Sequence, residues 1–203
     1  MKQGWKFRDE YFSGMISLRD TIYIEDRHKL EKIKEAYHTD TSVLFNYSAK
    51  SGDKLIINIY ARKFEKNKHK LSLADTVYKF IHNEKRIDYL NAKNLIDGKK
   101  AYGIDGDIPN SEIGKMVVFW NKKQLVIPIN ATFDLYKAHL NSVEAYFIKK
   151  KNLIYLYMEG ADGSAAYAVK FVFNKNTFVT RIVTTNECTK GFDFLDALPK
   201  DCE

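Results

Sequence analysis

Three runs of β-forming residues in the C-terminal third constrain the fold of this chain more than any other part of its sequence. Aliphatic and aromatic residues predominate in each run, and short segments containing Gly, Asp and Asn separate the runs. Such runs are typical of consecutive antiparallel strands, and alternation within the middle run would place Phe171 on one face and Lys170 on the other. We therefore predict a three-stranded meander over residues 153–158, 167–173 and 178–183.

The same reasoning predicts further strands upstream. Two apolar runs on either side of a Ser-Ala-Lys-Ser-Gly-Asp segment indicate a hairpin, and a second hairpin is expected across residues 121–123. The Asp97-Gly98 dipeptide tolerates the positive backbone angles of a tight turn, so short strands are expected on both sides of it. The expected upstream strands lie within residues 15–24, 43–47, 55–60, 94–103, 116–120 and 124–129.

Two segments have the apolar spacing of helices. The first follows Asp26, whose side chain can cap a helix. Leu30, Ile33 and Tyr37 would share one face of this helix, and the charged residues between them would occupy the other face. We therefore predict a helix between Asp26 and Tyr37.

A second helix is predicted from Ser72 to about Asn83. Ser72 and Asp75 have the spacing of a capping box. The apolar side of this helix would be formed by Leu73, Val77, Phe80 and Ile81. Together with the strands, these segments predict an α+β fold that is mainly antiparallel β-sheet, with two or three helices and the C-terminal meander.

The sequence indicates a single domain covering residues 1–203. A chain of this length fits one hydrophobic core, and apolar residues make up 45% of it. The three prolines and ten glycines are scattered singly, so no segment has the composition of a flexible linker. No repeat at a fixed period is present, which argues against solenoids and propellers.

The formal net charge of +7 favours an acidic partner. A nucleic acid is not expected, because the sequence has no zinc-finger, RNP or basic-zipper signature and its basic residues are only weakly clustered. A membrane span is not expected either, since no apolar run is long enough to cross a bilayer. A protein with an acidic surface is therefore the preferred partner.

Two cysteines, Cys188 and Cys202, lie close together near the C-terminus. A disulfide between them would enclose about 15 residues and stabilise the fold by roughly 3 kcal/mol on the chain-entropy model. Two free thiols are the alternative. Their isolation and proximity favour a bridge, and hence an extracytoplasmic location from which a leader has been removed, with a cytoplasmic location as the alternative.

No familiar catalytic, metal or cofactor motif is found in the sequence, so we expect no cofactor and no metal. The acidic turn from Asp105 to Glu112 was compared with calcium-binding loops, because hard cations collect carboxylate and carbonyl oxygens. Pro109 occupies a position where an EF-hand loop needs a ligand. We therefore predict that this turn is structural.

Several polar and aromatic residues remain as candidates for ligand contacts. The loop containing Asp162 could hold an anion on its backbone donors, although a plain hairpin loop is the simpler interpretation. Carboxylates can act as acid and base only where their surroundings separate their pKa values. The candidate binding residues are Tyr102, Asp105, Asp107, Glu112, Asp134, Tyr136 and Asp162.

Several short motifs in the C-terminal half occur in an order that resembles a group of uncharacterised exported bacterial proteins. They are residues 96–98, 102–109, 112–113, 116–129, 134–136, 155–158, 162–163, 167 and 178–183. Ile104 and Asp107 depart from the pattern of that group, in which smaller or neutral residues are expected. The resemblance implies an exported bacterial protein and supplies no catalytic residue.

Two functional hypotheses follow. The first is a non-enzymatic, extracytoplasmic protein that binds another protein, for example an immunity-type protein that neutralises a toxin. The second is an enzyme or a carbohydrate- or ligand-binding module whose site is assembled from Asp105, Asp107, Glu112 and Asp134. The absence of a catalytic motif and the positive charge favour the first hypothesis.

Overall fold

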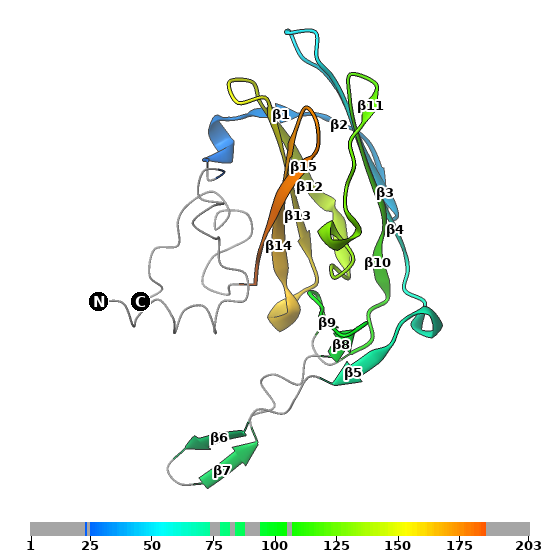
Figure 1. The fold of residues 1–203 in the computed structure, drawn as a ribbon, viewed down its shortest axis with the longest axis vertical. Helices are drawn as coiled ribbons and strands as arrows, with labels where there is room; N and C mark the ends of the chain where they lie inside the picture. The colour runs from blue at the N-terminus through cyan, green and yellow to red at the C-terminus, as the bar shows by residue number, and fades with distance from the viewer. Residues whose placement is uncertain are drawn as a thin grey trace, which may run out of the picture.

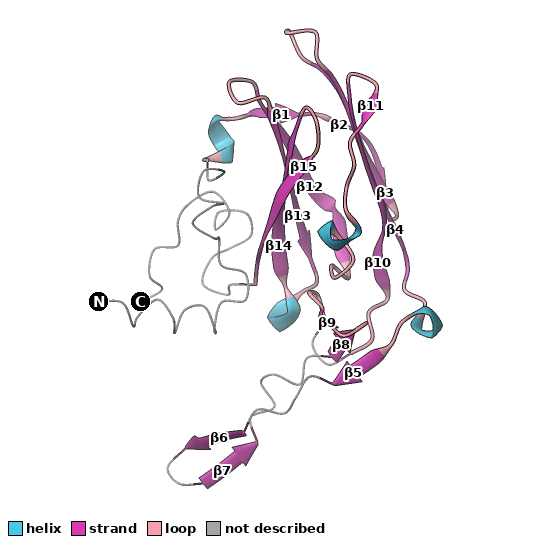
Figure 2. Cartoon of the chain, in the orientation of Figure 1, coloured by secondary structure: helices cyan, strands magenta, loops and turns pink. Residues whose placement is uncertain are grey.

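The computed structural model describes residues 23, 25–73, 78–81, 84–87, 94–104 and 107–185. These residues form antiparallel β-sheets, and within them there is no α-helix, only 3-10 turns (Figure 2). The 3-10 turns cover Arg27–Lys29 (η2), Lys66–Lys68 (η3), Ile129–Ala131 (η5) and Gly163–Ala165 (η6). The fold is therefore all-β.

Two five-stranded sheets form the body of the molecule (Figure 1). In the first sheet the strand order is β1 (Glu31–Ile33), β12 (Ala138–Ile148), β13 (Leu153–Gly160), β14 (Tyr167–Asn174) and β15 (Phe178–Thr184). In the second sheet it is β11 (Lys123–Gln124), β10 (Ser111–Trp120), β4 (Lys54–Lys63), β3 (Ser42–Ser48) and β2 (Glu35–Thr39).

Two small sheets complete the described strands. The first contains β5 (Leu71–Leu73), β8 (Asn94–Ile96) and β9 (Lys99–Lys100), and the second pairs β6 (Tyr78–Ile81) with β7 (Glu84–Ile87). The turn between β8 and β9 is Asp97-Gly98, with φ angles of 54° and 73°. The predicted Asp-Gly turn is thereby confirmed.

The chain passes from one large sheet to the other at Lys34. β1, which ends just before Lys34, pairs with β12 in the first sheet. β2, which begins just after Lys34, pairs with β3 in the second sheet. The two sheets are therefore continuous on this side. On the opposite side, β15 is the last strand of the first sheet and β11 is the last strand of the second, and among the described residues no strand pairing joins them (Figure 1). We call the boundary between these two edges the seam.

The main hydrophobic core lies between the two sheets. Alternate residues of each strand point into it, as expected for packed antiparallel sheets. Trp120 and Phe147 meet there edge to face, with ring centroids 5.7 Å apart. The buried residues that the facing strands contribute include Val43, Phe45, Ile57, Ile59, Val118, Ala145, Ile154, Leu156, Val169 and Phe171.

The helix predicted between Asp26 and Tyr37 is wrong. The Asp26 side chain does accept a hydrogen bond from the His28 backbone N–H (3.0 Å), but it caps only the 3-10 turn η2. The chain then continues as β1 and β2, in which Ile33 is fully buried in the inter-sheet core. The hydrogen bonds that this segment makes with β12 and β3 outweigh its helix propensity, which contributes only a small free energy per residue.

The helix predicted from Ser72 to Asn83 is also wrong. Ser72 lies in β5 and pairs with Leu95 in β8, so it caps no helix. Residues 78–81 form β6 of the β6–β7 hairpin. Asp75 and Val77 lie outside the described residues, as does all but residue 23 of the strand expected at residues 15–24. With both helices replaced by strands, the predicted α+β class is corrected to all-β.

Candidate functional site

Four residues singled out in the sequence are in contact in the structure: Tyr102, Glu112, Asp134 and Tyr136. The Tyr102 backbone N–H donates to the Asp134 carbonyl (2.8 Å), and the Tyr136 N–H donates to the Tyr102 carbonyl (3.1 Å). Glu112 and Tyr136 form an isolated antiparallel bridge. The loop before β12 is thus held against the start of β10 by backbone hydrogen bonds.

Asp134 is paired with Arg181 of β15. The two guanidinium Nη atoms each lie 2.5 Å from one carboxylate oxygen, and Nη1 also donates to the Ala131 carbonyl (3.0 Å). The Asp134 side chain is nearly buried, so this bidentate geometry compensates much of its lost hydration. Burial raises the pKa of the neighbouring Tyr102 hydroxyl, and the Asp134 charge adds to that rise.

Glu112 is held by two side chains from the loop side of β4. Arg62 Nε lies 2.7 Å from Oε1, and His69 Nε2 lies 3.2 Å from Oε2. Tyr136 is also buried beside Glu112, and burial together with that negative charge raises the pKa of the Tyr136 hydroxyl. The carboxylate oxygens of Glu112 are therefore already occupied by partners within the protein.

The other nitrogen of His69 reaches a second carboxylate. Nδ1 lies 2.8 Å from Asp97 Oδ2, and the imidazole stacks on the Phe64 ring with centroids 4.5 Å apart. A protonated imidazole has a donor on each nitrogen, so it can bond both carboxylates at once. The Lys70 backbone N–H and then His69 hold the pKa of Asp97 below its ordinary value.

The remaining predicted residues do not join this group. Asp107 pairs with Lys137 at 2.5 Å, and the Asp162 side chain is 96% exposed. Asp105, Cys188 and Cys202 lie outside the described residues, so the predicted disulfide and the first two residues of the predicted acidic turn are not described. Across the described residues, no three His, Cys, Asp or Glu side chains gather closely enough to hold a metal ion.

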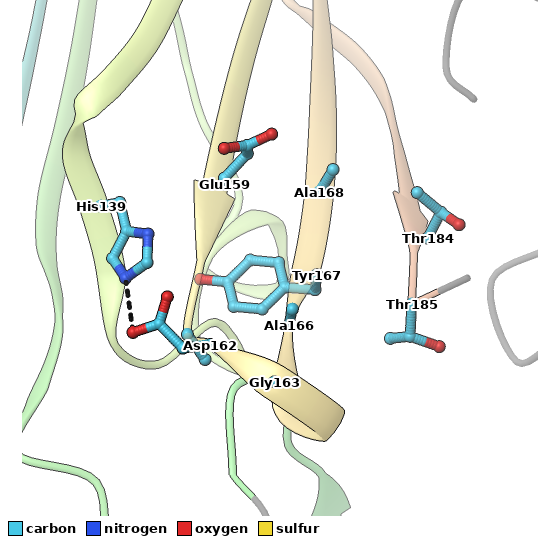
Figure 3. A pocket seen from close by; sticks show the side chains of 10 residues that line it. His139, Glu159, Asp162, Gly163, Ala166, Tyr167, Ala168, Thr184 and Thr185 are labelled. Atoms are coloured by element: carbon cyan, nitrogen blue, oxygen red, sulfur yellow. Dashed lines mark ion pairs between the residues drawn. The ribbon is translucent and has the colours of Figure 1, made fainter. Parts of the chain in front are cut away.

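Asp162 lines a small pocket between β12, β13 and β14 (Figure 3). The pocket has a volume of about 270 Å³, and the Tyr167 ring forms part of its wall. His139 Nε2 lies 3.9 Å from Asp162 Oδ2, which is too long for a hydrogen bond. These weakly held polar groups do not define a catalytic arrangement.

The outer face of the second sheet carries exposed apolar side chains. Tyr37 is 57% exposed, Ile56 40% and Tyr60 41%, and all three point away from the inter-sheet core. Leu44, Val117 and Phe119 are partly exposed on the same face. We call these six residues the aromatic face.

Strand register makes the aromatic face continuous. Tyr37 lies opposite Leu44 in the row that also contains Asn58 and Val117. Ile56 lies opposite Phe119 in the next row. From β2 to β10 the face crosses three strand spacings, or about 14 Å. Exposed apolar side chains that adjoin in this way are typical of interaction surfaces.

Basic side chains border the aromatic face. Lys115 lies opposite Tyr60, and Lys54 and Arg62 lie at the two ends of β4 on the same side of the strand. The Arg62 side chain remains 57% exposed although it bonds Glu112. Strands β3 and β4 contain no acidic residue. The border therefore has a positive charge.

Sequence reasoning placed strands at 43–47 and 55–60 but did not identify this face. The run from Leu55 to Tyr60 is apolar at both odd and even positions, apart from Asn58, so alternation cannot show which side is covered. The signal that could have indicated this face is a basic residue at each end of the apolar run, namely Lys54 and Arg62. Which side faces solvent depends on the partner sheet, which is distant in sequence.

Comparisons with known proteins add no relative: no protein-family model, curated protein or solved structure matches the chain. The resemblance to exported bacterial proteins therefore stays a prediction. Among the described residues, no helix has the length and apolar character needed to cross a membrane.

Proposed function

We propose that this protein acts by binding an acidic protein, without turnover, through the aromatic face. The carrying observation is a continuous group of exposed aromatic and aliphatic side chains with a basic border. Tyrosine is frequent among residues that dominate binding energy, because it buries a large ring and keeps a polar end. The basic border would speed the encounter with a negative partner.

A second copy of the chain is a poorer occupant of the aromatic face. In a symmetric dimer through this face the basic border of one copy would adjoin that of the other, and although Glu112 pairs with Arg62, β3 and β4 offer no acidic residue to neutralise Lys54 and Lys115. The chain as a whole also carries a net charge of +7. An acidic partner removes this repulsion.

The alternative of a carboxylate-based enzyme receives less support. Asp107, Glu112 and Asp134 are each held by a different cation, namely Lys137, Arg62 and Arg181. A carboxylate that is tied to a cation is a weakened proton acceptor. These ion pairs hold loops and strand ends together, which is a structural role.

The finer form of the proposal is an extracytoplasmic protein that neutralises a toxin. It is supported by the resemblance to exported proteins and by the two cysteines near the C-terminus. In this form the acidic protein would be the toxin, and the aromatic face would cover part of its surface.

The test is to identify partners by co-purification from the native cell and to measure the purified pair by surface plasmon resonance. Replacing Ile56 and Tyr60 together by Asp should weaken binding at least about 30-fold, as expected for the centre of an interface. Ile108→Asp is the matched control, because Ile108 is 47% exposed but lies in the loop before β10. This control should bind like the unchanged protein.

Salt dependence gives a second readout. Raising the ionic strength from low to physiological should slow association more than it speeds dissociation, because screening acts mainly on long-range attraction. A partner that binds the Ile56/Tyr60 variant as tightly as the unchanged protein would refute the aromatic face. Turnover of a substrate that is lost in Glu112→Gln without unfolding would refute the binding role itself.

A further inference from the structure

The seam presents a strand edge that is open on the side away from β14. β15 is the last strand of the first sheet, and among the described residues it pairs with β14 alone. The other side of the molecule is closed, because the chain runs directly from β1 into β2. An unpaired edge presents backbone donors and acceptors to which another strand can bond.

A pocket of about 410 Å³ follows this edge. It lies between β15 and the segment that contains η5, which Figure 1 shows between the two sheets. Four consecutive residues of β15, Phe178–Arg181, line it, which corresponds to about 13 Å of extended chain. The pocket is therefore long enough to lie beside several residues of an added strand.

The lining combines apolar and positively charged groups. Phe133, Phe178 and Val179 supply the apolar part. Arg181 is held by Asp134 and by the Ala131 carbonyl, so its charge is already compensated within the protein. Lys99 Nζ lies 5.3 Å from the centre of the Phe133 ring, and within the described part of the chain no carboxylate pairs with it. A carboxylate in the pocket would give Lys99 a partner.

Two of the most exposed apolar side chains in the described residues lie just before Asn130, where the chain begins to line this pocket. Ile129 in η5 is 83% exposed, and Val126 in the segment between β11 and η5 is 76% exposed. The alternate residues Leu125 and Ile127 pack into the core, so this segment is extended with one side outward. It offers apolar contacts to a chain lying along β15.

We propose that the seam binds an extended peptide segment that adds as a strand to β15, with an acidic side chain at Lys99 and apolar side chains against Phe178 and Ile129. In such strand addition, backbone hydrogen bonds supply affinity and side-chain pockets supply specificity. The site lies outside the aromatic face, so it does not depend on the function proposed above.

The test is selection from a random heptapeptide library displayed on phage, using the full chain as target. Enriched peptides should carry Asp or Glu among β-branched residues, and fluorescence anisotropy should measure their affinity. Lys99→Glu should weaken them at least tenfold, and Ile129→Ser should weaken them several-fold. Lys115→Glu, at the border of the aromatic face, should leave them unchanged.

Backbone pairing is tested separately by N-methylating alternate amides of a selected peptide. A peptide has two sets of alternate amides, and methylation of the set that bonds β15 should reduce its affinity at least tenfold. Amide NMR shifts of residues 178–181 should move on binding. Three results would each overturn the proposal: no enrichment, peptides that bind the Lys99→Glu protein equally well, or self-association showing that β15 pairs with a second copy. None of these outcomes bears on the aromatic face.

Discussion

We expect Asp53 to stabilise the contact between two turns of the second sheet in a pH-dependent way. It lies in the turn between β3 and β4, and its Oδ1 accepts hydrogen bonds from Trp120 Nε1 and Asn121 Nδ2, both at 3.0 Å. The Ser51 hydroxyl donates to Oδ2 at 2.8 Å, and Lys175 Nζ lies 3.5 Å away. The Trp120 hydrogen bond and then the Ser51 bond lower the Asp53 pKa from 3.8 to about 2.

The size of the effect follows from this shift. This lowering of the Asp53 pKa corresponds to a stabilisation of about 2 kcal/mol at neutral pH. Because the pKa of Asp53 is lower in the folded state, the stabilisation is fully present above about pH 4. It is lost as the pH falls toward 2, where the carboxylate becomes protonated in the folded state too.

Asp53→Asn should therefore reduce the free energy of unfolding by about 2 kcal/mol at pH 7, measured by urea denaturation. The difference between the variant and the unchanged protein should shrink between pH 4 and pH 2, because only the unchanged protein loses a charge at this position. Comparing the two proteins at each pH cancels the titration of all other carboxylates.

Trp120→Phe is the companion variant, because it removes the Nε1 donor while keeping a smaller aromatic ring in the core. In this variant the Asp53 pKa should rise, so the acid-dependent loss should begin at a higher pH. A stability difference between Asp53→Asn and the unchanged protein that stays constant from pH 7 to pH 2 would refute the electrostatic explanation and leave only a packing effect.

Three further predictions concern other parts of the chain. Gly160→Ala should lower the unfolding free energy by about 1–3 kcal/mol in thermal denaturation, because the added Cβ would lie 2.3 Å from Tyr167 Cζ; unchanged stability would contradict this packing. Cys188 and Cys202 should resist alkylation without reductant in protein made in an oxidising compartment, and two alkylated thiols in its intact mass would exclude the bridge. Calorimetric titration should detect no micromolar calcium affinity in the acidic turn at residues 105–112, and heat from tight binding there would show that the turn is a metal site.

The parts of the fold that sequence predicted correctly are those that depend on neighbours along the chain. The β3–β4 hairpin and the β13–β14–β15 meander pair consecutive strands through short turns, and both were found. Each of the two predicted helices failed because its segment divides into two strands, one that pairs with a neighbour along the chain (β2 with β3, β6 with β7) and one that pairs with a more distant strand (β1 with β12, β5 with β8). Lys32 of β1 lies opposite Tyr146 of β12, a contact that no window of ten or twenty residues contains.

The structure brings four of the candidate residues together, namely Tyr102, Glu112, Asp134 and Tyr136. No local pattern in the sequence indicated Arg181 or His69 as partners of the acidic residues. Ion pairs between distant strands depend on register, which local composition does not encode. The carboxylates therefore looked available in the sequence although the folded chain occupies them.

The outer faces of the two large sheets differ in a way that bears on the proposed function. On the first sheet, Lys170 was predicted to lie on the other face of its strand from Phe171. It does so, but its side chain is fully buried. Its ammonium donates to the Tyr23 carbonyl (2.7 Å) and lies 4.1 Å from the centre of the Tyr155 ring. That face carries its own buried cluster, so its apolar residues are explained by packing within the chain.

In the part of the chain that the structure describes, no comparable cluster covers the outer face of the second sheet. Ile56 and Tyr60 remain 40% and 41% exposed there, whereas Tyr155 and Tyr157 on the outer face of the first sheet are 0% exposed. Apolar side chains on the first sheet stabilise the folded monomer, since burial of their surface is favourable. The same residue types on the second sheet gain little of this stabilisation until another molecule covers them. Packing within the described residues therefore explains the apolar side chains on the outer face of the first sheet. Those on the outer face of the second sheet stay exposed, as the proposed binding role requires.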